Sequence, residues 1–131
     1  MDLEAQEFLC ACLNSFVINA VVRMLMGSHI TTTLAGSLPI PVWRGDAIDR
    51  TIALLVRRLA RPAAPQRVMA RLQGLVAHRF GLTRETFQHV LAGFPLVPST
   101  ERAAALEWYE RYDRQCRGEA TARSDERLLL P

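Results

Sequence analysis

The side chains with the clearest capacity for chemistry are arginines, because a guanidinium stays charged and donates paired hydrogen bonds to phosphate or carboxylate groups. All sixteen basic residues of this chain are arginine. Nine lie between Arg44 and Arg84 against two acids, a local net charge of +7, whereas residues 1–43 and 85–131 each carry a net charge of −2. A basic middle third is what a surface facing a polyanion requires. The alternative interpretation is a solvated face on arginine-rich helices.

The other reactive side chains form no familiar catalytic or metal-binding pattern. The three histidines are not spaced as metal ligands, and the cysteines, Cys10, Cys12 and Cys116, contain no Cys-x-x-Cys pair. The sequence has no glycine-rich phosphate-binding loop and no nucleophile elbow. We interpret Asp46 as a helix cap and Asp49 as solvated surface rather than as an acid–base pair. We therefore predict no autonomous active site, and buried, reduced thiols in a cytoplasmic protein.

The elements that must position the arginines are predicted to be mostly helices, so we expect a mainly α fold. Apolar residues recur at helical spacing through most of the chain, and helix-capping residue types precede several of these stretches. Threonines and two prolines after the first stretch favour one short extended or β segment near residues 29–42. Helices are predicted over residues 3–26, 46–61, 66–80, 84–92 and 100–116.

The chain accordingly divides into three regions. Residues 1–43 contain a long apolar helix and the extended segment, and residues 44–116 form an arginine-rich helical region. Residues 117–131 are a polar tail that we predict to be flexible.

The helix predicted over residues 3–26 is apolar on nearly all sides. Such a helix must be buried on more than one side, which suggests that it docks onto a partner surface outside this chain. Its length also raises the question of a membrane, but Asn14, Asn19 and Arg23 interrupt it, so we predict no membrane span. One of its apolar stripes consists of Leu9, Leu13, Phe16, Val17, Ala20 and Met24.

Two segments resemble a known family. Residues 13–41, LNSFVINAVVRMLMGSHITTTLAGSLPIP, resemble a stretch of bacterial adenine-specific DNA methyltransferases of type II and IIG-like restriction-modification systems. Residues 75–98, LVAHRFGLTRETFQHVLAGFPLVP, are similar to the closing helices of that family, with Phe80 where tyrosine is common. The resemblance covers residues 3–115, and it rests on short apolar motifs in a consistent order and spacing.

The resemblance implies that this chain is the end of a target-recognition region followed by C-terminal helices. In the family, S-adenosylmethionine and the target adenine bind an upstream methyltransferase domain, through a glycine-rich loop and an Asn/Asp-Pro-Pro-Tyr/Phe motif. Neither motif occurs here. The resemblance therefore implies a truncated or split product without a cofactor of its own. Its partners would be double-stranded DNA and the upstream methyltransferase domain or subunit.

A methyltransferase of this family must flip an adenine out of the duplex while contacts to the phosphates hold the duplex in register. Arg23 and the polar residues that follow the first helix would lie near the DNA, and arginines of the middle third would contact phosphates. The threonines and the histidine of this set fit a β-strand equally well. Trp43 could stack on a base, but we favour core packing for it, as for Trp108, Tyr109 and Tyr112. The DNA-binding candidates are Arg23, Ser28, His29, Thr31, Thr32, Thr33, Arg50, Arg57, Arg58, Arg67 and Arg71.

The favoured function is thus a non-catalytic DNA-recognition accessory region of an adenine-specific DNA methyltransferase. The main alternative is a helical protein-interaction module that docks a partner subunit through its apolar first helix. A third possibility is the remnant of a broken gene. DNA binding that weakens steeply with salt separates the first function from the second.

Overall fold

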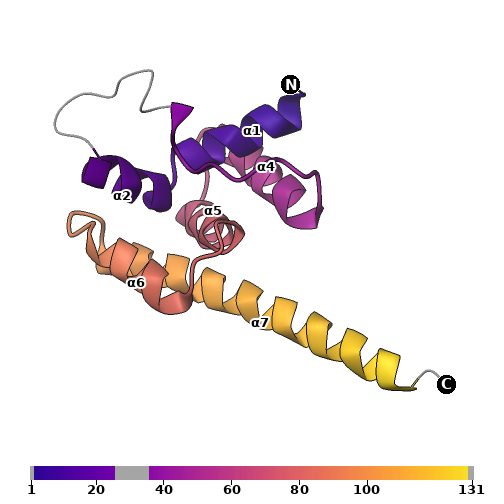
Figure 1. The fold of residues 1–131 in the computed structure, drawn as a ribbon. Helices are drawn as coiled ribbons and strands as arrows, with labels where there is room; N and C mark the ends of the chain where they lie inside the picture. Colours follow the sequence, from indigo (N-terminus) through magenta and orange to yellow (C-terminus); the bar gives the residue numbers. More distant parts are fainter. Residues whose placement is uncertain (1, 26–35, 130–131) are drawn as a thin grey trace.

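The computed structural model describes residues 2–25 and 36–129, with side chains described as far as residue 120. These residues are mainly helical and contain no strand, which confirms the mainly α prediction (Figure 1). The helices are α1 (Leu3–Leu13), α2 (Phe16–Leu25), α4 (Ala47–Leu59), α5 (Gln66–Arg79), α6 (Arg84–Ala92) and α7 (Ser99–Leu129).

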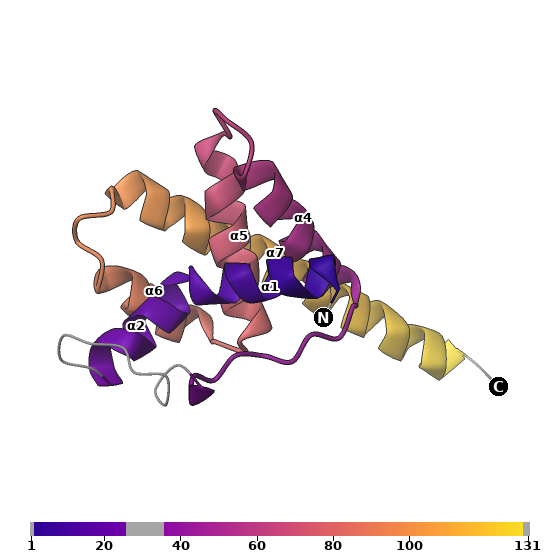
Figure 2. The same cartoon turned by 90° about the horizontal axis from the view of Figure 1, so that it is seen from above.

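Helix α5 lies at the centre of the fold. It packs along α7 on one side and against α4 and α1 on the other (Figures 1 and 2). Helix α1 packs against α4, and α2 contacts α6. The C-terminal part of α7 extends beyond the other helices in both views.

Two apolar clusters hold these helices together. The first lies where α1, α4 and α5 meet, and its buried members include Phe8, Ile52 and Leu72. The second joins α2 and α5 to α6 and α7, and its buried members include Val17 and Phe87. Apolar residues that recur at helical spacing in the three middle helices, such as Ile52, Leu72 and Phe87, therefore lie on faces that the fold buries.

Capping residues that the sequence identifies begin α4 and α6. The Asp46 carboxylate accepts a hydrogen bond from the backbone nitrogen of Asp49, and the Thr83 hydroxyl accepts one from the backbone nitrogen of Thr86. Both side chains satisfy backbone N–H groups that the first turn of a helix leaves unpaired. The predicted starts of these two helices are confirmed.

The single helix predicted over residues 3–26 is wrong, because α1 and α2 are separate helices. The side-chain amide of Asn14 donates to the Cys10 carbonyl oxygen at the end of α1, at 2.8 Å. The hydroxyl of Ser15, a buried residue, accepts a hydrogen bond from the backbone nitrogen of Ile18 at 3.2 Å and so caps the start of α2. Asparagine and serine at this junction thus end one helix and begin the next.

The two helices point in different directions, being bent by 56° at their junction. Among the described residues, no single helix combines the length and apolar character needed to cross a bilayer. Helices α1 and α2 reach that length and composition only when they are taken together.

The break also changes which apolar residues are buried. Phe8 and Cys12 of α1 are enclosed against α4 and α5, whereas Leu13 and Met24 of the predicted stripe are 46% and 79% exposed. The predicted stripe is therefore wrong at these two positions, because the bend takes the two halves out of register. The chain itself covers one side of α1, and exposed apolar side chains remain at its ends and at the end of α2.

The segment before α4 forms neither a helix nor a strand from residue 38 to residue 45. The ring of Trp43 packs edge-on against Phe8, with ring centroids 5.5 Å apart, so the preferred interpretation of Trp43 as core packing is confirmed. Residues 26–35, which contain the first half of the predicted extended segment, lie outside the described residues.

Helix α7 is longer than the sequence predicts. It continues through residues 117–129, where we expected a polar tail rather than a helix. The Nε of Arg117 lies 2.9 Å from Oδ2 of Asp113, an i,i+4 ion pair that bridges the expected end near Cys116. No proline or glycine cap interrupts the helix after Cys116, since Gly118 is accommodated within it.

Candidate nucleic-acid interface

Three of the predicted DNA-binding arginines line one hollow. Arg50 and Arg58 of α4 and Arg71 of α5 surround a cavity of about 330 Å³ together with Thr51, Leu54 and Leu55. Arg50 and Arg58 are eight residues apart, so they lie on one face of α4, two turns from each other. Arg71 approaches this face from the neighbouring helix. We call the surface lined by these three residues the arginine groove.

The arginine groove continues into a second hollow of about 210 Å³ that α7 also lines. Thr51 and Arg71 border both hollows, and Tyr112 and Glu119 line the second one from α7. Arg71 therefore stands at the junction between the α4–α5 surface and the α7 surface.

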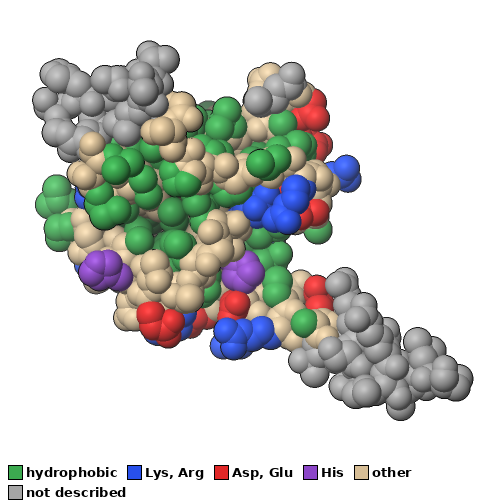
Figure 3. Space-filling model, viewed as in Figure 1, with side chains coloured by type: hydrophobic (Ala, Val, Ile, Leu, Met, Phe, Trp, Pro, Cys, Tyr) green, Lys and Arg blue, Asp and Glu red, His purple; other side chains and the backbone are tan. Residues whose placement is uncertain are grey.

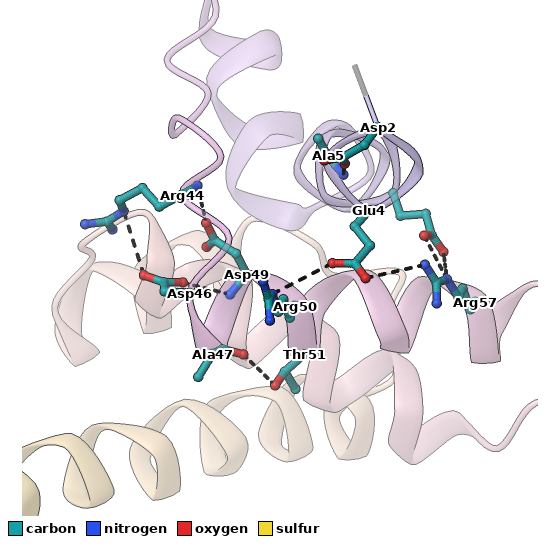
Figure 4. Close-up of polar contacts among 11 residues, drawn as sticks. Asp2, Glu4, Ala5, Arg44, Asp46, Ala47, Asp49, Arg50, Thr51 and Arg57 are labelled. Atoms are coloured by element: carbon teal, nitrogen blue, oxygen red, sulfur yellow. Dashed lines mark hydrogen bonds and ion pairs between the residues drawn. The ribbon is translucent and has the colours of Figure 1, made fainter.

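Acidic side chains of α1 neutralise part of the basic middle third (Figure 4). The Nε of Arg57 lies 2.7 Å from Oε2 of Glu7, and the Glu4 carboxylate lies 4.0 Å from both Arg50 and Arg57. The hydrogen bond that Arg57 donates to the Glu7 carboxylate raises the pKa of Arg57. Arg57, although predicted to contact phosphate, is engaged within the fold, and Arg50 shares its charge with Glu4.

A second part of the predicted charge is buried. The Nε of Arg79 lies 2.7 Å from Oδ1 of Asp49, with side-chain exposures of 8% and 0%. The Asp49 Oδ2 also accepts a hydrogen bond from the backbone nitrogen of Arg44, at 2.7 Å. Arg79 donates in addition to the Val42 carbonyl oxygen. The interpretation of Asp49 as solvated surface is therefore wrong, because its carboxylate joins the segment before α4 to α5.

The charge that remains available is smaller than the sequence suggests and is concentrated near the arginine groove. Within the described part of the chain, Arg58, Arg61, Arg67 and Arg71 form no ion pair. Arg58 and Arg71 line the groove, and Arg67 lies one helical turn before Arg71 on α5. These four guanidiniums are free to meet an external anion.

The other predicted DNA contacts do not join this surface. The Nη1 of Arg23 donates to the Gly93 carbonyl oxygen at 2.9 Å, and its guanidinium lies 4.2 Å from the centre of the Phe94 ring. Arg23 therefore ties α2 to the loop after α6. The remaining predicted contacts lie outside the described residues; they are Ser28, His29, Thr31, Thr32 and Thr33.

A larger polar hollow of about 690 Å³ lies between α5, α6 and α7, and sequence reasoning missed it. The Nε2 of His78 lies 3.1 Å from Oδ1 of Asp113, a residue 35 positions away, so no local motif could reveal the pair. Arg84 is paired with Glu110 across the same hollow. Its three arginines are matched by three acids, so the hollow lacks the excess of one sign that distinguishes the arginine groove.

The cysteines and potential metal ligands in the described part of the chain form no second candidate site. Cys12 is buried, as we predicted for the thiols, but Cys10 is exposed and Cys116 is partly buried. Burial raises the pKa of the Cys12 thiol to about 12, so this thiol is protonated and unreactive at neutral pH. Among the residues that the structure describes, no three His, Cys, Asp or Glu side chains lie close enough together to hold a metal ion.

No family model matches this chain, and no curated protein and no solved structure matches it either. The resemblance to adenine-specific DNA methyltransferases therefore stays an expectation from the sequence, and the function has to be argued from the geometry of the surface.

Proposed function

We propose that this chain binds the phosphate backbone of double-stranded DNA through the arginine groove. The observation that carries the proposal is the convergence of Arg50, Arg58 and Arg71, from two helices, on one hollow. Guanidiniums suit this role because their planar N–H donors match pairs of phosphate oxygens.

The distribution of paired and unpaired arginines supports a polyanion rather than a single carboxylate ligand. Arg67 and Arg71 lie one turn apart on α5, whereas Arg58 lies in the last turn of α4 and Arg61 just beyond the end of that helix. A row of charges on adjacent helices fits the regular repeat of phosphates along a duplex, which lie about 3.4 Å apart in rise on each strand. Such contacts position a protein on DNA without reading its sequence.

This proposal fits the accessory role that the resemblance implies. The chain would hold the duplex while a separate methyltransferase domain binds S-adenosylmethionine and the flipped adenine. Five further candidates for DNA contact lie outside the described residues and stay predictions; they are Ser28, His29, Thr31, Thr32 and Thr33. Assignment to the cytoplasm stays a prediction that goes with this role.

The test is duplex-DNA binding by the full chain across a series of salt concentrations. We expect the logarithm of the affinity to fall linearly with the logarithm of salt concentration, with a slope of about 0.9 per phosphate contacted. Arg58→Gln should weaken binding and reduce this slope by about one unit, because Arg58 lines the groove and has no internal partner in the described part of the chain.

Arg84→Gln is the matched control. It removes the same charge from the same third of the sequence, but Arg84 lines the polar hollow by His78. Its slope should therefore equal that of the wild-type chain. No binding at low salt would overturn the proposal, and so would an equal loss for both variants, since net charge alone would then explain the affinity.

A second candidate function is docking of a partner protein, and an exposed apolar surface favours it. Met24 and Leu25 at the end of α2 are 79% and 57% exposed, and Leu96 in the loop before α7 is 98% exposed. Phe94 and Val97 of this loop line an adjoining hollow of about 400 Å³. In the view of Figure 3, hydrophobic side chains gather over α2 and this loop. Exposed apolar patches of this kind are typical of interaction sites.

Light scattering of the full chain over a range of concentrations tests this second candidate. If the apolar surface is a docking site, the chain should self-associate through it when no partner is present. The substitutions Met24→Ser and Leu96→Ser should then restore a monomer without changing DNA affinity. A monomer at all concentrations for the wild-type chain would contradict the second candidate.

A further inference from the structure

We propose that Trp108 holds the guanidiniums of Arg71 and Arg111 as a second phosphate-binding pair, which extends the arginine groove onto α7. The inference rests on the proposed function and names a part of the DNA-binding surface that the sequence assigns to packing. Trp108 acts in it as a positioning residue, and Arg71 and Arg111 are the groups that contact phosphate.

The guanidiniums of two arginines, from two different helices, contact the same indole ring. The Cζ of Arg111 lies 4.4 Å from the centre of the Trp108 ring, and the Cζ of Arg71 lies 5.3 Å from it. Both distances are within the range of cation–π attraction. Arg111 follows Trp108 by three residues on α7, whereas Arg71 approaches from α5. The ring therefore contacts both Arg71, which lines the groove, and Arg111, which belongs to the acidic C-terminal third of the sequence.

The indole ring is anchored at a close contact between α5 and α7. A Cβ atom added to Gly74 would lie 2.9 Å from the Cβ of Trp108, so the base of this side chain rests on the α5 backbone. Trp108 is partly buried, and Arg71 precedes Gly74 by less than one turn. The position of the ring is thus fixed by the helix contact rather than by a flexible loop.

Stacking leaves the guanidiniums ready to bind an anion. A guanidinium that lies over an aromatic ring keeps the N–H donors at its edge available for hydrogen bonds in its own plane. Because the ring restricts the motion of both side chains, less conformational entropy is lost when they meet a phosphate. The ligand class that fits is the phosphodiester backbone, since Arg71 belongs to both the groove and the stacked pair.

One acidic neighbour competes for Arg111. The Oε1 of Glu107 lies 3.5 Å from Nη2 of Arg111, and these side chains are 67% and 56% exposed. Exposed i,i+4 pairs of this kind are weak and are screened by salt. A phosphate that also contacts Arg71 can therefore replace this contact.

The experiment measures duplex-DNA affinity across a salt series for Arg111→Gln, Trp108→Leu and Trp108→Phe in the full chain. Arg111→Gln should reduce the salt slope by about one unit. Trp108→Leu keeps both charges but removes the aromatic face, so affinity should fall about two- to fivefold, as for an exposed cation–π contact. Trp108→Phe should recover part of that loss, which a purely structural role of the indole would not predict.

Arg114→Gln is the control on the same helix, because Arg114 lines the polar hollow by His78 instead. It should leave the affinity and the slope unchanged. Arg111→Gln changes an exposed side chain, so it keeps the inference testable even if Trp108→Leu fails to fold.

A second readout uses the indole itself. The chain has two tryptophans, so Trp43→Phe leaves Trp108 as the only one, and we expect its fluorescence to change when DNA is added. If Arg58→Gln weakens binding while Arg111→Gln and both Trp108 variants bind like wild type, this inference is overturned and the proposed function stands. If the wild-type chain does not bind DNA, both are overturned.

Discussion

Gly74 of α5 lies so close to Tyr109 of α7 that a Cβ atom added to the glycine would be 2.7 Å from the Tyr109 backbone nitrogen. The same atom would lie 2.7 Å from the Ala105 carbonyl oxygen. Non-bonded carbon atoms pack at about 3.5–4.0 Å, so the two helices meet backbone to backbone at this point. This contact places the Trp108 ring beside Arg71, and it therefore connects the packing of the core to the proposed DNA-binding surface.

Gly74→Ala should destabilise the fold. The new methyl group would collide with backbone atoms, which cannot move aside without shifting α7. Overpacking of this kind costs about 1–3 kcal/mol. Urea denaturation followed by circular dichroism measures the change in the free energy of unfolding.

Gly118→Ala is the matched control within a helix. Nothing lies within 4 Å of a Cβ added to Gly118, and its neighbours on α7 are exposed. Alanine is favoured over glycine in a helix by about 1 kcal/mol, so this variant should be as stable as wild type or more stable. Equal effects of the two substitutions would contradict the close contact at Gly74.

The helices that the sequence predicts well are those whose capping residues and apolar periodicity lie within or next to the helix itself. Helices α4 and α6 begin at Asp46 and Thr83, whose side chains cap them, and their apolar residues recur on one face. The break between α1 and α2 was missed because the apolar pattern runs through its local caps, Asn14 and Ser15, and because one of its hydrogen bonds involves a distant residue. The backbone nitrogen of Phe16 donates to Oε1 of Gln73, 57 residues away, and this bond supports the 56° bend between the two helices.

The sequence predicts which residue types make up the candidate site, but not how the fold arranges and pairs them. The sequence shows an excess of arginine, and three of the predicted residues do line one hollow. It cannot show that Glu7 meets Arg57, which is 50 residues away, or that Asp49 is buried against Arg79. Which charges remain free is decided by tertiary contacts, and a count of charges along the chain cannot predict them.

Gln73→Leu should destabilise the junction between α1 and α2. The Gln73 side chain is 5% exposed, and its Oε1 accepts a hydrogen bond from the backbone nitrogen of Phe16 at 2.9 Å. Leucine fills a similar volume but leaves this backbone N–H without its partner, at a cost of about 1–3 kcal/mol. Thermal unfolding followed by circular dichroism measures the loss.

Gln115→Leu serves as the comparison, because Gln115 is exposed on α7. A surface change of this type alters stability by about 0.5 kcal/mol or less. If the two variants unfold at the same temperature, the Gln73 side chain does not hold the junction.

Asp49→Leu should destabilise the chain strongly, because it leaves the buried Arg79 guanidinium without its anion. Removing one partner of a buried ion pair costs about 3–5 kcal/mol. Replacing both partners, with Asp49→Leu and Arg79→Met together, should recover much of the loss, since no uncompensated charge then stays buried. Full recovery is not expected, because the Arg44 backbone nitrogen and the Val42 carbonyl oxygen also lose their partners.

A double-mutant cycle in urea measures this coupling directly. The two single variants and the double variant give an interaction energy that is free of effects common to each substitution. Additive losses would show that Asp49 and Arg79 act independently, contrary to the 2.7 Å contact between them.

Alkaline pH should destabilise the fold. Burial raises the pKa of the Cys12 thiol from about 9 to about 12, and it also raises the pKa of Tyr109 and of Tyr112. Between pH 9 and pH 12 the unfolded chain therefore releases protons that the folded chain retains. Because stability falls with rising pH wherever the folded state binds more protons, the free energy of unfolding should decrease throughout this range.

Cys12→Ala isolates the contribution of the thiol to this pH dependence. The variant should be less stable than wild type at neutral pH, because it leaves a small cavity beside Phe8 in the first apolar cluster. Above pH 9 its stability should nevertheless fall less steeply, by at most about 1.4 kcal/mol per pH unit for one proton. Cys10→Ala is the control, since Cys10 is exposed and its loss should leave the slope unchanged. Urea denaturation at several pH values between 7 and about 11 gives these slopes, and parallel curves for the wild-type chain and Cys12→Ala would show that the buried thiol does not ionise on unfolding.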